Sequence, residues 1–165
     1  MARARRVSVR SITPFLWFHD EAEEAAKFYV SVFQGSRIVE VFHYNEHRKG
    51  HGPKVLTVAF ELAGQPFLAL NGGPEFEFTP AVSLFVSCAT QREVDTLWER
   101  LSEGGKKGRC GWLEDKYGLS WQVVPSQLRE LTNDREPERA RRVMAALMKM
   151  SKLDLVGLER AYRGS

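Results

Sequence analysis

The sequence predicts an α+β fold in which one order of elements occurs twice and is followed by a helical tail. Residues 12–74 indicate a strand, a helix and then further strands. Residues 75–126 indicate the same order, although the two stretches share negligible sequence identity. After residue 126, apolar side chains recur at helical spacing. A repeated pattern of this kind decides the architecture, so we expect two similar halves and a tail of linker and helices over 127–165.

The first half begins with an apolar, aromatic run over 12–18 that favours a strand. A helix follows, with Asp20 as its expected N-cap and Gly35 at its end. Three- and four-residue steps give this helix a buried stripe of Ala22, Ala25, Ala26, Tyr29 and Phe33. Strands are expected over 37–44, 54–62 and 66–70, with a polar loop over 45–53. His43, His47 and His51 are interpreted as members of that solvated loop, with a metal or catalytic role as the alternative.

The second half begins with a strand over 81–88 and a helix that starts at the capping box of Thr90 and Glu93. Further strands are expected over 106–110, 112–113 and 119–124. Between the last two strands, a tight turn ends at Gly118, where glycine permits a positive φ. Glu114 and Asp115 lie at this turn and are interpreted as solvated residues, with a catalytic carboxylate pair as the alternative.

The tail is expected to hold a linker over 127–136 and then two helices. Pro137 suits the first position of a helix, and Asp154 suits the N-cap of a short last helix. The first helix carries the apolar stripe Val143, Ala146, Leu147 and Met150, and the second carries Leu155, Leu158 and Tyr162.

Charge and cysteine content exclude several classes of protein. The net charge of +3, from 24 basic and 21 acidic residues, is too balanced to predict nucleic-acid binding. No apolar run approaches the roughly 20 residues of a membrane span, so no membrane partner is expected. The basic tail over 1–11 lacks the apolar segment of a signal peptide. Cys88 and Cys110 form no CxxC motif, and two reduced thiols in a cytoplasmic protein are expected.

Several motifs together resemble one known family, the PhnB-like or 3-demethylubiquinone-9 3-methyltransferase-domain family. That family belongs to the vicinal-oxygen-chelate superfamily, which has the glyoxalase/bleomycin resistance/dihydroxybiphenyl dioxygenase fold. The resemblance is carried by Ile-Thr-Pro-Phe-Leu-Trp-Phe (12–18), Glu-Ala-Ala-Lys-Phe-Tyr (24–29), Phe-Glu-Leu-Ala-Gly-Gln-Pro-Phe (60–67), Tyr-Gly-Leu-Ser-Trp-Gln-Val-Val-Pro (117–125) and, in the tail, Arg-Arg-Val-Met (141–144) and Met-Lys-Met-Ser-Lys-Leu-Asp (148–154).

The resemblance implies paired βαβββ modules, residues 12–74 and 75–126, within a single domain that forms a homodimer around a cavity. It also implies four metal-ligand positions, which fall at Pro14, Ala69 beside Asn71, Val82 beside Ser83, and Gln122. Among the four, Gln122 alone has a donor atom, and an amide oxygen is a weak ligand for a transition metal. No catalytic metal is therefore expected. No cofactor is expected either, because Gly72-Gly73 is followed by Pro74 and not by the helix that a nucleotide-like cofactor needs.

Alternating side chains predict a small-molecule pocket that is aromatic and has few polar groups. The predicted ligand-binding residues are Phe15, Trp17, Phe67, Asn71, Ser83, Phe85, Trp112 and Gln122. The predicted function is small-molecule binding without a catalytic metal. The alternatives are an enzyme of the superfamily, either a metal-dependent lyase or isomerase or a methyltransferase, and a structural dimer with a packed interior. The sequence leaves open whether any reaction is catalysed.

Overall fold

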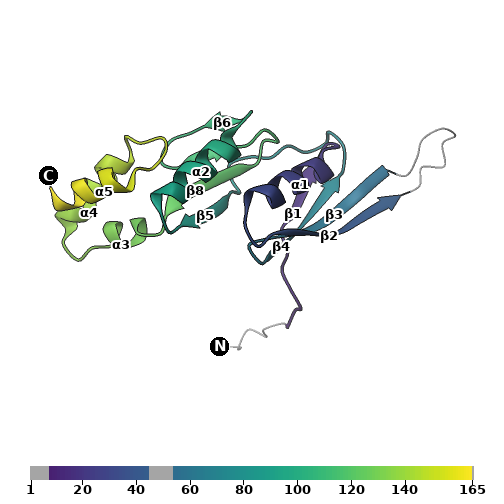
Figure 1. Ribbon diagram of the computed structural model, residues 1–165, viewed down its shortest axis with the longest axis horizontal. Helices are drawn as coiled ribbons and strands as arrows, with labels where there is room; N and C mark the ends of the chain where they lie inside the picture. Colours follow the sequence, from purple (N-terminus) through teal and green to yellow (C-terminus); the bar gives the residue numbers. More distant parts are fainter. Residues whose placement is uncertain (1–7, 45–53, 165) are drawn as a thin grey trace, which may run out of the picture. The chain divides into compact units, whose positions relative to one another are not determined.

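The computed structural model describes residues 8–44 and 54–164 (Figure 1). Residues 1–7 of the basic tail, the loop 45–53 with His47 and His51, and Ser165 lie outside the described residues. The chain divides into two compact units, the first ending at Phe76 and the second beginning at Glu77. In the described ranges, no helix combines the length and the apolar character that crossing a membrane would require.

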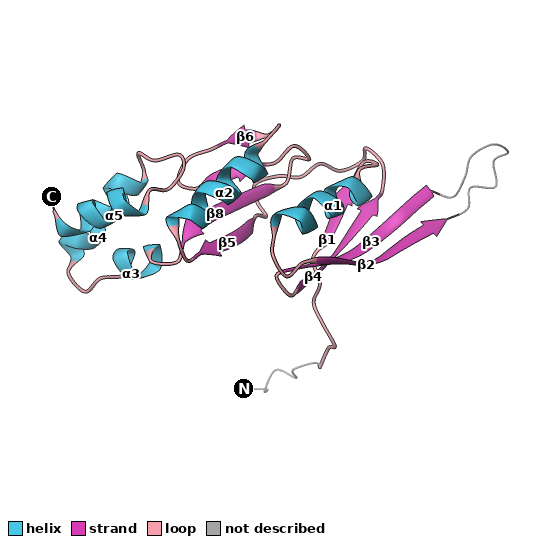
Figure 2. Ribbon diagram, viewed as in Figure 1, coloured by secondary structure: helices cyan, strands magenta, loops and turns pink. Residues whose placement is uncertain are grey.

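The first unit is a four-stranded sheet with one helix on it (Figure 2). Its elements are β1 (Phe15–Phe18), α1 (Ala22–Val32), β2 (Arg37–Tyr44), β3 (Lys54–Leu62) and β4 (Gln65–Asn71). The strand order is β1-β4-β3-β2, with β1 parallel to β4 and the other neighbours antiparallel. The expected order of strand, helix and three strands is confirmed.

The second unit repeats this topology. Its elements are β5 (Leu84–Cys88), α2 (Gln91–Ser102), β6 (Lys106–Lys107), β7 (Trp112–Glu114) and β8 (Ser120–Pro125), in the sheet order β5-β8-β7-β6. The outer pair β5 and β8 is again parallel. Three helices follow: α3 (Leu128–Thr132), α4 (Pro137–Leu147) and α5 (Leu155–Arg163). Helix α3 was not predicted, and it lies in the stretch expected to be a linker.

Aromatic rings fill the core of the first unit, between α1 and the sheet. Tyr29 of α1 stacks on Phe60 of β3 with ring centroids 6.3 Å apart, and Phe60 stacks on Phe67 of β4 at 5.4 Å. Ala25 and Ala26 are fully buried, and such small side chains allow the helix to lie close to the sheet. Phe67 is therefore part of this core.

The start of α1 is held by a side chain from a distant strand. The Asn71 carbonyl oxygen accepts a hydrogen bond from the Ala22 N–H at 2.8 Å, and its amide donates to the Val55 carbonyl at 3.1 Å. The expected cap, Asp20, does not perform this role, since Glu21 occupies the N-cap position and makes no capping bond with its side chain. Asn71 thus satisfies one of the free N–H groups of the first turn.

In the second unit, α2 covers one face of the sheet and begins as the sequence predicts. The capping box of Thr90 and Glu93 is present at its N-terminus. Trp98 and Val94 on its inner side are buried, as is Trp121 on β8. Strand alternation places Val124 on the opposite face of β8, away from α2.

The interpretation of Asp115 as a solvated turn residue is wrong. Its side chain is 1% exposed and accepts three hydrogen bonds. The donors are the Tyr117 N–H at 2.9 Å, the Leu119 N–H at 3.1 Å and the Trp121 indole N–H at 2.8 Å. The expected turn itself is confirmed, because the Gly118 N–H donates to the Asp115 carbonyl at 3.0 Å and Gly118 has φ of 85°. Asp115 thus fixes the turn and orients Trp121.

The C-terminal helices pack on the face of the second sheet that α2 leaves open. Backbone hydrogen bonds join the two parts, from the Cys110 N–H to the Met150 carbonyl at 2.9 Å and from the Gly111 N–H to the Ser151 carbonyl at 2.8 Å. An apolar cluster lies beside these bonds and consists of Val124 on β8 with Val143, Leu147, Leu153 and Leu158. The tail is therefore a part of the second unit and covers one end of its sheet.

Candidate small-molecule pocket

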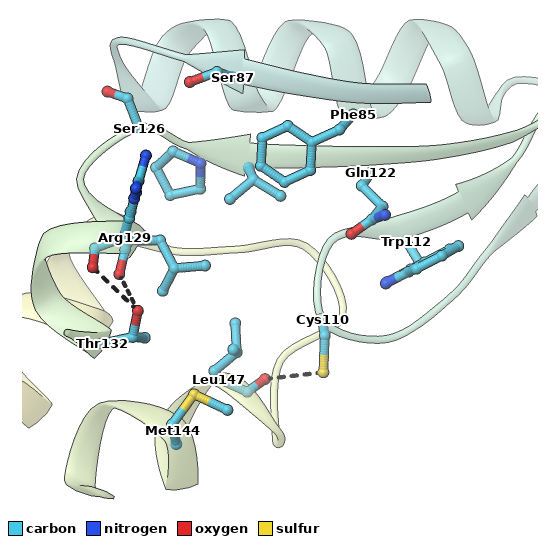
Figure 3. A pocket seen from close by; sticks show the side chains of 13 residues that line it. Phe85, Ser87, Cys110, Trp112, Gln122, Ser126, Arg129, Thr132, Met144 and Leu147 are labelled. Atoms are coloured by element: carbon cyan, nitrogen blue, oxygen red, sulfur yellow. Dashed lines mark hydrogen bonds between the residues drawn. The ribbon is translucent and has the colours of Figure 1, made fainter. Parts of the chain in front are cut away.

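A pocket of about 580 Å³ lies in the second unit, between the open face of the sheet and the C-terminal helices (Figure 3). Its lining is mainly apolar and aromatic, with a few hydroxyl groups, one amide and one guanidinium group. The lining residues are Phe85, Ser87, Cys110, Trp112, Gln122, Val124, Pro125, Ser126, Leu128, Arg129, Thr132, Met144 and Leu147.

The sheet provides the aromatic wall. Gln122 on β8 is paired with Phe85 on the parallel strand β5 and with Trp112 on the antiparallel strand β7. Paired residues project from the same face, so the amide lies between two aromatic side chains (Figure 3). Phe85 is 61% exposed, which is unusual for a phenylalanine in a strand and leaves most of its ring open to a ligand.

The orientation of the Gln122 amide is set by a neighbouring hydroxyl group. Its Nε2 donates to the Ser83 Oγ at 2.9 Å. Ser83 does not itself line the pocket but positions a residue that does. The structure thus brings together four of the eight predicted site residues, namely Ser83, Phe85, Trp112 and Gln122.

The helices provide the second wall, which the sequence analysis missed. Leu128, Arg129 and Thr132 come from α3, and Met144 and Leu147 come from α4. The amphipathic stripe of 143–150 indicated that the tail needs an apolar partner, but it gave no sign of which sheet face that partner would be. At the junction, the Cys110 thiol donates to the Leu147 carbonyl at 3.6 Å.

The other four predicted residues lie in the first unit and do not share one wall. Phe15 is paired with Leu68, so Phe67, one residue earlier, points to the opposite face of the sheet. Phe15 and Trp17 therefore lie on the face away from α1, whereas Phe67 and Asn71 lie on the side of α1. These four predicted side chains are thus divided between the two faces of the first sheet.

Trp17 packs against its own unit. Its indole N–H donates to the Gly73 carbonyl at 2.9 Å, and its ring meets Phe76 edge-on with centroids 5.0 Å apart. A Cβ at Gly72 would lie 2.3 Å from the indole, so glycine is required for this contact. Phe15 differs, since it remains 53% exposed.

A second pocket, of about 640 Å³, lies in the first unit and has a different character. Ionisable side chains of both signs line much of it, including Asp20, Glu23 and Lys54, and Asn71 contributes an amide already used to cap α1. Sites for drug-sized molecules are mainly apolar with a few polar groups. The pocket of the second unit fits that description better.

The metal positions implied by the resemblance do not fit a divalent metal ion. Pro14, Ala69 and Val82 carry no side-chain donor, and the Asn71 carbonyl oxygen is used by α1. Gln122 supplies one amide, already oriented by Ser83. Within residues 8–44 and 54–164, no three His, Cys, Asp or Glu side chains gather as a metal site would require.

The glycines after β4 do not fit a nucleotide-like cofactor. Such a cofactor uses free backbone N–H groups at the start of a helix. The Gly72 N–H donates to the Phe18 carbonyl at 2.9 Å, and the Gly73 N–H donates to the His19 carbonyl at 3.1 Å. Both N–H groups are therefore occupied, and the Trp17 ring packs against Gly72. This segment packs within the first unit and does not offer these two N–H groups to a cofactor.

Each unit has the element order βαβββ, and the first strand lies at one edge of the sheet, parallel to the last strand. Two such units make up the fold of the vicinal-oxygen-chelate superfamily. The model of the 3-demethylubiquinone-9 3-methyltransferase family matches residues 10–124, and the chain belongs to that PhnB-like family. The match ends at Val124, so the helices that complete the pocket lie beyond it. A search of curated proteins found no match.

Two solved structures are similar to this chain, and the first supports the family assignment. The PhnB protein from Bacillus cereus, named for a 3-demethylubiquinone-9 3-methyltransferase, is 39% identical with a TM-score of 0.63, over 70% of this chain and 99% of its own. The protein PA1353 from Pseudomonas aeruginosa is 17% identical with a TM-score of 0.58, over 71% of this chain and 97% of its own. The second likeness shows the fold alone.

Proposed function

We propose that this protein binds a small, flat and largely apolar molecule in the pocket of its second unit. The observation that carries the proposal is the exposed ring of Phe85 beside Gln122 and Trp112, facing the apolar side chains of α3 and α4. A volume of about 580 Å³ suits a ligand of drug size. Members of the superfamily to which the family belongs bind small molecules, which supports the same function.

The ligand is proposed to lie along the aromatic wall, with the Gln122 amide as its main polar contact there. Aromatic groups stack or meet edge-to-face on such rings and gain energy beyond the area they bury. The amide, held by Ser83, gives the ligand a fixed direction. Since no donor set for a metal lies at this wall among the described residues, the proposed binding needs no metal ion.

Replacing Phe85 by alanine is expected to weaken binding of the neutral fluorescent probe N-phenyl-1-naphthylamine about five- to tenfold, because the probe loses its stacking partner. Titration followed by fluorescence gives the dissociation constant. Phe76→Ala is the matched control, since Phe76 is 65% exposed but belongs to the first unit. The proposal fails if the full chain shows no saturable binding, or if both variants lose affinity equally.

The alternative functions have tests of their own. A methyltransferase, as the family name suggests, would be favoured by a rise in melting temperature with S-adenosylmethionine. A metal-dependent lyase or isomerase would be favoured by a stoichiometric metal in protein purified without chelators. The occupied glycine N–H groups and the missing donor atoms lead us to expect neither result.

We also propose that the chain forms a homodimer in the cytoplasm. The face of the first sheet away from α1 exposes large apolar side chains, with Phe15 at 53% and Phe42 at 52%, and a partner would bury them. Sedimentation equilibrium is expected to give the mass of two chains, and a single-chain mass at micromolar concentration would exclude the dimer. Two free thiols, Cys88 and Cys110, favour a reducing compartment, and burial raises the pKa of the Cys88 thiol to about 11.

A further inference from the structure

One pocket side chain carries a charge that the fold does not use. Arg129 on α3 lines the pocket and is exposed. Among the described residues, no hydrogen bond or ion pair engages its guanidinium group. The arginines of α4 differ, since Arg141 pairs with Glu138 and Arg142 donates to the Ala161 and Tyr162 carbonyls. Arg129 thus has no structural partner that explains its position.

The surroundings of Arg129 favour a negative ligand group. The described residues that line the pocket include no aspartate or glutamate. Leu128 and Leu131 pack against the apolar cluster of the tail and so fix α3 in place. Figure 3 shows Arg129 beside Ser126 at one end of the pocket, with Gln122 and Trp112 at the other end. The pocket therefore has one cationic end and one aromatic end.

We propose, on the basis of the function proposed above, that the ligand is a flat apolar molecule carrying an anionic group, which Arg129 binds. A guanidinium group presents a planar fork of donors that matches the two oxygens of a carboxylate, sulfonate or phosphate group. The aromatic part of the ligand lies against Phe85 and Trp112, and the anionic group lies at the end formed by α3. The pocket thus selects aromatic acids over neutral aromatic molecules.

Two probes that differ by one group test this selection. N-phenyl-1-naphthylamine is neutral, and 8-anilino-1-naphthalenesulfonate has the same rings with one added sulfonate. We expect the sulfonate probe to bind the full chain about tenfold more tightly, because a charge-assisted contact is added. In Arg129→Gln, we expect that preference, measured as the ratio of the two dissociation constants, to fall to about one. Glutamine retains helix propensity, so α3 is preserved.

Arg92→Gln is the matched control, because Arg92 is exposed on α2, outside the pocket, and its loss changes the net charge equally. It is expected to leave the preference intact. Equal affinity of the full chain for the two probes would overturn this inference and leave the proposed function standing. An unchanged preference in Arg129→Gln, or an equal loss in Arg92→Gln, would also overturn it. If neither probe binds, the proposed function itself fails.

Discussion

Replacing Asp115 by alanine is expected to lower the free energy of unfolding of the second unit by about 3–5 kcal/mol. The carboxylate is 1% exposed and accepts from the Tyr117 and Leu119 N–H groups and from the Trp121 indole. Alanine would leave three donors without an acceptor in a site that water does not reach. The turn before β8 would loosen, and with it the strand that carries Gln122.

Chemical denaturation followed by tryptophan fluorescence measures this loss, because Trp121 reports on the same site. Glu114→Gln is the matched control. Glu114 is the preceding residue and pairs with Lys106 at 2.7 Å in an exposed ion pair, which is worth at most about 1 kcal/mol. Similar losses for the two variants would show that burial of Asp115 does not stabilise the unit.

Replacing Gly111 by alanine is expected to cost about 3 kcal/mol and to weaken the attachment of the C-terminal helices. Gly111 has φ of 82°, which alanine adopts only with strain. A Cβ there would also lie 2.7 Å from the Val123 carbonyl oxygen and 3.2 Å from the Leu153 side chain. Leu153 is fully buried in the cluster that holds the tail, so the clash would spread to the helical wall of the pocket.

Gly118→Ala separates backbone strain from the clash. Gly118 has a similar φ of 85°, but the nearest heavy atom to its Cβ would be 4.0 Å away, on Phe78. We expect this control to lose about 1 kcal/mol and to keep its affinity for N-phenyl-1-naphthylamine. Gly111→Ala should lose both stability and probe affinity. Equal effects of the two substitutions on denaturation and titration would contradict the proposed role of Gly111.

Much of the fold was predictable because it depends on local patterns. Alternation identified β3 with its observed bounds, and the capping box identified the start of α2. Contacts between distant residues were not predictable in this way. Asn71 caps a helix that begins 49 residues earlier, a relation that no local pattern reveals. Asp115 looks like a surface turn residue until Trp121, six residues later, folds back onto it.

Four of the eight predicted site residues lie together at one pocket, for a related reason. Alternation shows which residues of one strand share a face, but the pairing between strands decides which faces combine. The parallel pairing of Phe15 with Leu68 separates Phe67 from Phe15, whereas the pairing of Gln122 with Phe85 and Trp112 brings these three together. The helical wall depends on which sheet face the tail packs against, and no local sequence pattern reveals that contact.

A crystal structure of the full chain with N-phenyl-1-naphthylamine would show whether the pocket of the second unit is the binding site. We predict electron density for the probe against Phe85 and Trp112, enclosed on its other side by α3 and α4. Density for the probe on the first unit instead, against Phe15 and Trp17, would contradict the claim that the second sheet and the C-terminal helices form the binding site.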